Sequence, residues 1–198
     1  MVPTLPEYRF PYARIFNRQI LTVYPFIFGI FDIINVLYNL RFTIQCCTNK
    51  EQNIFDKEKL QKVVRSLAPE YSLKMIEEDI LNQSRANDWS RDLVSQYKDY
   101  DMYRRLGIGA VVLKDGIPVS GASAYLRYRE GIEIEIDTKE EYRRKGLAYI
   151  CGAKLILECL ERELYPSWDA QNKWSVTLAE KLGYHFDHEY TAYEIRGY

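Results

Sequence analysis

The sequence predicts a mixed α/β (α+β) fold, because strand-like and helix-like patterns follow one another through the last two-thirds of the chain. Two stretches carry this prediction. Residues 132–137 (IEIEID) alternate apolar and acidic side chains and precede RRKGLA at 143–148, which indicates a strand, a short turn and the start of a long helix. A second unit follows, with a strand predicted over 165–170 and a helix from the capping residue Asn172 to about Leu182.

The remaining elements follow from the same patterns. Asp115-Gly116 is a strong hairpin signal between two apolar stretches. The spacing of Trp174, Leu178, Ala179 and Leu182 predicts the buried face of the last helix. We expect a helix over 57–67, a strand over 71–73, amphipathic helices over 76–86 and 89–106, and strands over 107–113 and 119–128.

Composition narrows the functional classes. The 198 residues include 27 basic and 28 acidic side chains, a net charge of −1, so the chain lacks the basic footprint of a nucleic-acid-binding protein. The four cysteines show neither metal-ligand spacing nor a disulfide framework, which favours a reducing, cytoplasmic location. His185 and His188 have no further ligands near them in the sequence, so we expect no metal site.

The first part of the chain differs in character. Residues 20–40 are strongly apolar and long enough for a membrane span, but Pro25 and Asp32 interrupt them. We therefore favour a buried or partner-facing segment, with a membrane-tethered form as the alternative. The sequence predicts an apolar N-terminal segment at 1–56, which includes a polar linker at 48–56, and a folded domain at 57–198.

The turn at 143–148 has the chemistry of a phosphate cradle. A helix start leaves backbone N–H groups without internal partners and carries the positive end of the helix dipole. Gly146 and Ala148 remove side chains that would keep an anion away, and the cations at 143–145 add charge. Neither the dinucleotide fingerprint G-x-G-x-x-G nor the ATP-type loop G-x-x-x-x-G-K-S/T occurs, so another phosphate-binding family is indicated.

The pattern Arg-x-x-Gly-x-Ala resembles the pyrophosphate signature R/Q-x-x-G-x-G/A of the GNAT (N-acetyltransferase) superfamily. The stretch 67–198 is similar to a bacterial group of GNAT-like acetyltransferases in which EIEIDT…YRRKGLA and YPSWDAQN…LAEKLGY…EYTAYEI recur. The resemblance implies a central, mostly antiparallel twisted sheet with helices on both faces. It also implies an acyltransferase that uses acetyl-CoA, without a metal, to acetylate a small-molecule or peptide amine. A longer N-terminal half precedes the domain in that group, so 1–56 would be a shortened or diverged version of it.

The resemblance also implies which residues contact the cofactor. Asn172 borders the CoA channel in this family, besides being a good N-cap, and Ser175 accompanies it. Backbone N–H groups near the end of the 132–137 strand would polarise the thioester carbonyl. The full expected set is Ile136, Asp137, Thr138, Arg143, Arg144, Lys145, Gly146, Leu147, Ala148, Asn172 and Ser175.

Alternation places Glu133, Glu135 and Asp137 on one face of their strand. They are either exposed or paired with Arg127 and Arg129 across the hairpin, or they line an acceptor cleft. In a cleft, neighbouring carboxylates raise one another's pKa, so one could act as general base for an amine. GNAT enzymes often use a Glu on this strand, and we favour Glu135 over Glu133.

The chain departs from the family pattern at one position. Ala179 stands where many GNAT enzymes carry the tyrosine that protonates the leaving thiolate. Tyr184, Tyr190 or water would then supply this proton. A non-catalytic acyl-CoA-binding regulatory module is the alternative function. The sequence leaves open the acceptor, the role of Ile20 to Leu40 and the oligomeric state, with a homodimer as one option.

Overall fold

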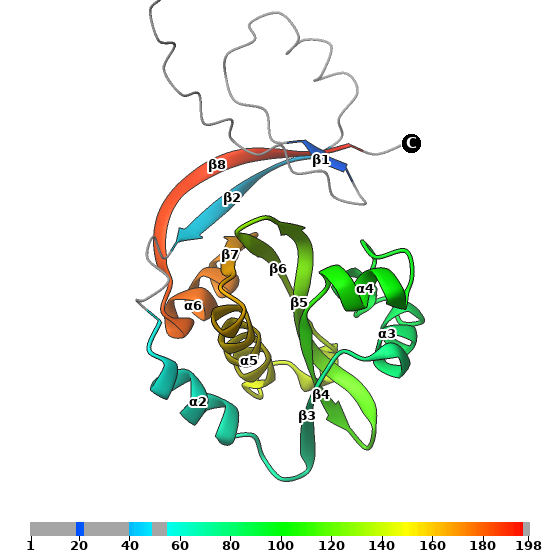
Figure 1. Ribbon diagram of the computed structural model, residues 1–198. Helices are drawn as coiled ribbons and strands as arrows, with labels where there is room; N and C mark the ends of the chain where they lie inside the picture. The colour runs from blue at the N-terminus through cyan, green and yellow to red at the C-terminus, as the bar shows by residue number, and fades with distance from the viewer. Residues whose placement is uncertain (1–18, 22–39, 49–54, 196–198) are drawn as a thin grey trace, which may run out of the picture. The chain divides into compact units, whose positions relative to one another are not determined.

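The computed structural model describes residues 19–21, 40–48 and 55–195, and their side chains from 55 to 190 (Figure 1). The chain divides into two compact units, residues 45–189 and residues 1–44 with 190–198. Most of the apolar segment at 20–40 and of the linker at 48–56 lies outside the described residues, and the limits 1–56 and 57–198 stay a prediction. Among the described helices, none is both long and apolar enough to cross a membrane.

The larger unit is built on a mixed sheet with the strand order β2-β7-β6-β5-β4-β3. Neighbouring strands are antiparallel, except that β6 and β7 run parallel. The strands are β2 (Leu40–Thr48), β3 (Tyr71–Met75), β4 (Gly109–Lys114), β5 (Ile117–Tyr128), β6 (Gly131–Thr138) and β7 (Tyr165–Ala170). In the smaller unit, β1 (Gln19–Leu21) pairs antiparallel with the end of β8 (His185–Ile195).

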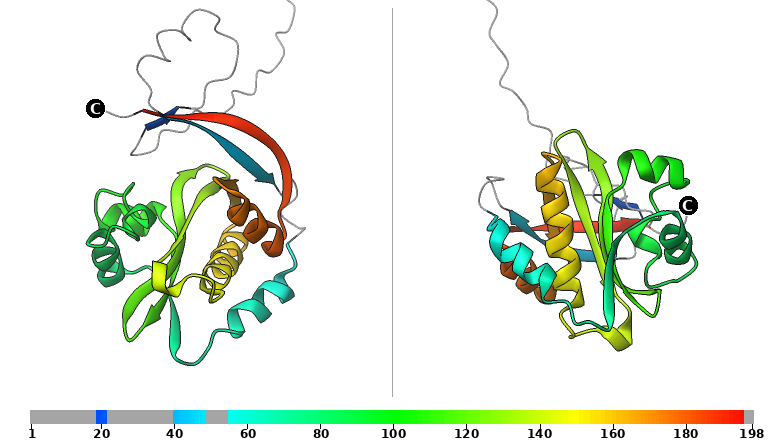
Figure 2. Two further views of the ribbon diagram at one scale, coloured as in Figure 1. Left: turned by 180° about the vertical axis from the view of Figure 1, so that it is seen from behind. Right: turned by 60° about the horizontal axis from the view of Figure 1, so that its bottom comes forward.

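Helices cover both faces of the sheet (Figure 1, Figure 2). One face packs against α5 (Leu147–Glu161), flanked by α2 (Lys57–Arg65) and α6 (Lys173–Leu182). The other face packs against α3 (Glu78–Arg85), the 3-10 turn η2 (Arg91–Leu93) and α4 (Tyr100–Leu106). A second 3-10 turn, η3 (Glu140–Tyr142), joins β6 to the start of α5. The expected mixed α/β architecture is confirmed.

The single helix predicted over 89–106 is wrong. The structure has η2 and α4 there, separated by an irregular segment. Asp99 takes an extended backbone conformation, and its side chain accepts a hydrogen bond from the Met102 N–H at 2.8 Å, so a new helix begins after it. Tyr97 is turned into the core, where its hydroxyl donates to the Ala124 carbonyl at 2.7 Å. The Asp99 cap and the buried Tyr97 hydrogen bond thus interrupt the helix that the apolar spacing over 89–106 predicts.

The predicted buried face of α6 is wrong in part. Ala179 and Leu182 are buried, but Trp174 is 86% exposed. At 3.6 residues per turn, Trp174 lies about 140° around the helix from Ala179, so the two side chains cannot share one face. Val176 packs into the core instead. The exposed indole belongs to a different stripe of the helix.

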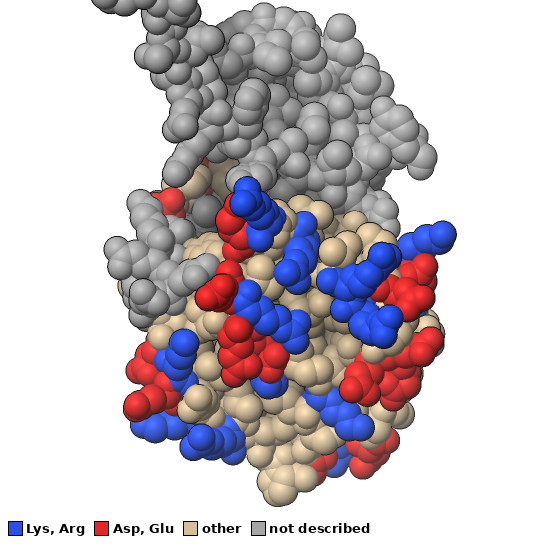
Figure 3. All heavy atoms as spheres, viewed as in Figure 1, with Lys and Arg blue, Asp and Glu red and all other residues tan. Residues whose placement is uncertain are grey.

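Acidic and basic side chains are mixed over the face of the molecule in Figure 3. Lys and Arg side chains lie beside Asp and Glu side chains, as the near balance of 27 and 28 charges suggests. Among the described residues on that face, no extended patch of a single sign stands out. Positive and negative side chains therefore alternate over short distances on this face.

Packing between α5 and the sheet gives a testable prediction. Leu155 is fully buried in the cluster of apolar side chains between them. Leu155→Ala should lower the free energy of unfolding by about 2–5 kcal/mol, because it removes buried methyl groups and leaves a cavity. Leu126→Ala, at a side chain that is 44% exposed, should change it by no more than about 0.5 kcal/mol. Urea unfolding measures both, and equal losses would contradict this packing.

Candidate functional site

The two parallel strands separate at their carboxyl ends. Pairing between β6 and β7 ends at Glu133 and Ser167, although β6 continues to Thr138 and β7 to Ala170. At the same level, the register of β5 against β6 shifts by one residue at Tyr125. Such a bulge bends and twists the sheet locally. The site therefore forms where strands of an open α/β sheet diverge, a usual place for ligands.

A cavity of about 630 Å³ lies at this separation. Its walls come from the end of β6, from β7, from the start of α5 and from one side of α6. Side chains from both faces of β6 line it, with Ile134 and Ile136 from the α5 side and Glu135 and Asp137 from the other. The volume lies within the range typical of small-molecule sites.

Most of the site residues expected from the sequence line this cavity. They are Glu135, Ile136, Asp137, Thr138, Arg143, Arg144, Gly146, Leu147, Ala148, Asn172 and Ser175. Two do not line it. Glu133 is 6% exposed and lies outside the lining, and the Lys145 ammonium lies 4.7 Å from the centre of the Tyr142 ring. The structure thus gathers the set in space, while the role of each residue stays a prediction.

The start of α5 differs from the other helix starts. Asp56, Asp99 and Asn172 cap α2, α4 and α6, each accepting a backbone N–H at 2.8–3.0 Å. The start of α3 lacks a side-chain cap but has two acidic residues in its first turn. Gly146 caps α5 with φ +78°, no side-chain hydrogen bond and no acid in the first turn. Among the described α-helices, α5 alone therefore begins with N–H groups that have neither a capping side chain nor an acidic residue of the first turn beside them.

The glycine at this position meets two requirements. A positive φ is strained for residues with a side chain. A Cβ added at Gly146 would also find no atom within 4 Å, so the space in front of the helix start is open. Because Gly146 lines the cavity, that space is continuous with it. The geometry suits an anion held by backbone N–H groups.

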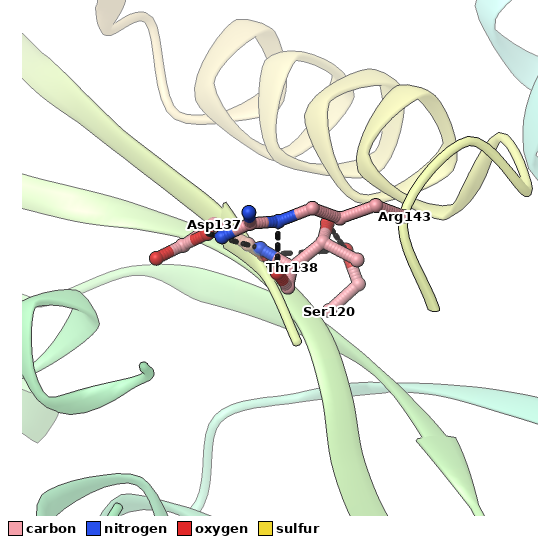
Figure 4. A network of polar contacts seen from close by, with 4 residues as sticks. All are labelled: Ser120, Asp137, Thr138 and Arg143. Carbon is pink, nitrogen blue, oxygen red and sulfur yellow. Dashed lines mark hydrogen bonds and ion pairs between the residues drawn. The ribbon is translucent and has the colours of Figure 1, made fainter. Parts of the chain in front are cut away.

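A network of polar contacts fixes the end of β6 (Figure 4). The Arg143 Nε donates to the Thr138 carbonyl at 3.1 Å, and its Nη2 lies 3.8 Å from Asp137 Oδ1. The same carboxylate oxygen accepts the Thr138 N–H at 2.6 Å. The hydroxyls of Ser120 and Thr138 are 2.7 Å apart, which ties the end of β6 to β5. Arg143 thus braces the strand end as well as facing the cavity.

Burial changes the acidity of one carboxyl group in the cavity. It raises the pKa of Asp137 above the ordinary aspartate value, and it outweighs the Thr138 N–H and Arg143, which act in the opposite direction. Asp92, on η2, adds a smaller contribution that also raises this pKa. Glu133 is buried and Glu135 is only partly buried, so solvent exposure of the acidic row is wrong, while its pairing with Arg127 and Arg129 stays a prediction. The site therefore holds carboxyl groups in unequal environments.

The α6 wall combines a helix cap with cavity contacts. The Asn172 side-chain oxygen accepts the Ser175 N–H at 3.0 Å, which confirms Asn172 as the N-cap. The Trp168 Nε1 donates to Ser175 Oγ at 3.0 Å and joins β7 to α6. Sequence reasoning missed several lining residues. Helical spacing was the only available signal for those on α5 and α6, which are Tyr149, Trp174, Thr177, Leu178 and Lys181, and alternation along β7 was the signal for Trp168.

The position of the usual thiolate acid and one of its candidate replacements, Tyr184, lie away from the cavity. Ala179 is fully buried among apolar side chains. Tyr184 is also buried, and its hydroxyl donates to the Pro166 carbonyl at 2.7 Å. Neither residue lines the cavity. Within the described residues, no three His, Cys, Asp or Glu side chains come together as metal ligands would.

Comparison with known proteins places these features in a family context. A family model described as GNAT acetyltransferase matches residues 38–193. The uncharacterized N-acetyltransferase YdfB of Bacillus subtilis is 36% identical over 123 residues, which are 61% of this chain and 47% of that protein. The chain thus spans about half the length of this curated relative.

Solved structures show the same fold. A GCN5-related N-acetyltransferase-like protein from Streptococcus suis is 45% identical with a TM-score of 0.81, over 89% of this chain and 71% of that one. A putative GNAT-family acetyltransferase from Novosphingobium aromaticivorans is 19% identical with a TM-score of 0.57, over 81% and 67% of the two chains. The second likeness concerns the fold alone. The fold implied by the sequence resemblance is confirmed.

Proposed function

The chain belongs to the GNAT acetyltransferase family, and on that basis we propose that it transfers an acetyl group from acetyl-CoA to a primary amine of a small molecule or peptide. The main support for the proposal is the start of α5. This helix start has no capping side chain, and Gly146 and two arginines there face the cavity. A doubly charged pyrophosphate matches this chemistry better than a neutral ligand. The cavity supplies the room that the rest of the cofactor needs.

The pyrophosphate is held mainly by backbone N–H groups at residues 146–148. Arg143 and Arg144 also line the cavity and add positive charge beside them. Because Arg143 already contacts Asp137 and Thr138, its first role is to hold the strand end in place. Arg144 is exposed and takes no part in the network of Figure 4, so it is the more mobile phosphate partner.

The pantetheine arm enters between the diverging strands. Its amide groups can pair with the edge of β6 beyond Glu133, in the manner of an added strand. This places the thioester near Ile136 to Thr138, where a backbone N–H would stabilise the negative charge that develops on the carbonyl oxygen. Asn172 and Ser175 border the cofactor channel from the α6 side.

The acceptor amine approaches from the acidic face of β6. Glu135 removes a proton from the ammonium group, and the neutral nitrogen attacks the thioester carbon. The new C–N bond forms and the C–S bond breaks, the CoA thiolate leaves, and the nitrogen gives up its second proton to solvent as it becomes the amide. We assign the proton that the thiolate takes up to water, with Tyr190 as the alternative donor, because Ala179 has no acidic proton and Tyr184 is buried with its hydroxyl bonded to the Pro166 carbonyl.

Thiol release tests the proposal. Purified protein with acetyl-CoA should release free CoA in the presence of some amine among small amines, aminoglycosides, peptide N-termini and lysine peptides. Acetylated product detected by mass spectrometry should rise in equal amount. Binding of acetyl-CoA without release of thiol for every amine would favour the non-catalytic acyl-CoA-binding module instead.

A further inference from the structure

Trp174 is the most exposed large apolar side chain in the described part of the chain. It is 86% exposed, and it lines the cavity from the first turn of α6. Burial of a large apolar side chain typically contributes about 1.5–3 kcal/mol, a stabilisation that this indole does not provide within its own unit. A side chain kept in water beside a ligand cavity is a candidate contact for that ligand.

The neighbours of Trp174 on α6 define the kind of ligand. Leu178 and Lys181 follow at i+4 and i+7, so the three side chains form one stripe, and all three line the cavity. The stripe therefore combines an aromatic face, an aliphatic side chain and a cation. This combination suits a flat, uncharged ring that is joined to phosphate.

The stripe is connected to the start of α5. The hydroxyl of Tyr149, in the first turn of α5, donates to the Lys181 carbonyl at 3.2 Å. Trp174 lies about 10 Å further along α6, at a rise of 1.5 Å per residue. A ligand whose phosphates lie at the start of α5 would thus extend along α6 toward the Trp174 indole. The distance between the phosphates and the indole would then be about the length of a nucleoside.

We propose that Trp174 is a stacking platform for the purine base of the CoA nucleotide, at the rim of the cavity that holds its pyrophosphate. This inference rests on the proposed function and adds to it the subsite for the base. Trp174 contacts the part of the cofactor farthest from the thioester, so it contributes to affinity and not to the chemical step.

The test compares two ligands by calorimetry, acetyl-CoA and S-acetyl-4′-phosphopantetheine, which lacks the 3′-phosphoadenosine part and one of the two bridging phosphates. Trp174→Ala should weaken acetyl-CoA about 5- to 100-fold, the range that base–aromatic stacking typically contributes. The same variant should leave the affinity for S-acetyl-4′-phosphopantetheine unchanged. Trp174→Phe should retain most of the affinity, because it keeps an aromatic face. In turnover assays, KM for acetyl-CoA should rise and kcat should stay unchanged.

A matched control is Phe186→Ala, which removes an aromatic side chain that is 47% exposed and lies outside the cavity lining. It should affect neither ligand. Equal affinity of Trp174→Ala and wild type for acetyl-CoA would overturn the inference, as would an equal loss for both ligands. A change from dimer to monomer in light scattering without loss of affinity would assign the indole to an interface between copies. No binding of acetyl-CoA by wild type would instead overturn the proposed function, and this inference with it.

Discussion

Gly146→Glu is expected to weaken acetyl-CoA binding by at least about 100-fold, because two or more charge-assisted hydrogen bonds, each worth about 1.5–3 kcal/mol, are lost. The new carboxylate would accept the N–H groups at the start of α5 and occupy the open space in front of them. It would also repel the pyrophosphate. Isothermal titration calorimetry of the folded variant measures the loss.

Gly116→Glu is the matched control for this variant. Gly116 has φ +81°, close to the +78° of Gly146, and a Cβ there also meets no atom within 4 Å. Both variants should therefore lose a similar stability, about 1–2 kcal/mol from the positive φ. Only Gly146→Glu should lose the ligand, since Gly116 lies in the β4–β5 turn outside the cavity lining. Equal affinities of the two variants would contradict the cradle.

Glu135→Gln is expected to lower kcat by about 10²–10⁴-fold, the usual contribution of a general base. The affinity for acetyl-CoA should stay unchanged, because the amide keeps the size of the carboxylate and the contacts at α5 are not affected. Steady-state assays and calorimetry on the same preparation separate the two quantities. Loss of affinity together with kcat would indicate a structural role.

Two neighbouring carboxyl groups supply the comparison. Glu133→Gln should change kcat less than Glu135→Gln, because Glu133 is buried outside the cavity lining. Asp137→Asn tests the competing base, since Asp137 lines the cavity and burial raises its pKa. If Asp137→Asn abolishes turnover and Glu135→Gln does not, the base is Asp137 and the assignment to Glu135 is wrong.

Features set by short-range chemistry could be predicted from the sequence. The alternation in β6, the Asn172 cap and the Gly146 start of α5 each depend on a few neighbouring residues. The irregular segment before α4 did not follow from periodicity, because its end is fixed by the Asp99 cap and by the contact of Tyr97 with distant Ala124. Local signals predicted the elements better than the breaks between them.

The shape of the site depends on contacts that the sequence pattern does not reveal. Separation of β6 from β7 after Glu133 is a matter of pairing between strands far apart in the chain. The difference between Glu133 and Glu135, which alternation treats as equivalent, follows from that separation. The spacing of three to four residues wrongly predicts that Trp174 is buried, because such a spacing tolerates an error in helix phase. Only the packing of α6 on β7 fixes which stripe faces the cavity.

Calorimetric titration of the wild-type chain with acetyl-CoA measures whether the start of α5 and its cavity hold the cofactor. We expect saturable binding of one acetyl-CoA per chain with a micromolar Kd, and competition by free CoA for the same site. Circular dichroism on the same sample establishes that the protein is folded. A folded protein that binds neither acetyl-CoA nor CoA would contradict the cradle at α5, and with it the proposed acetyl transfer.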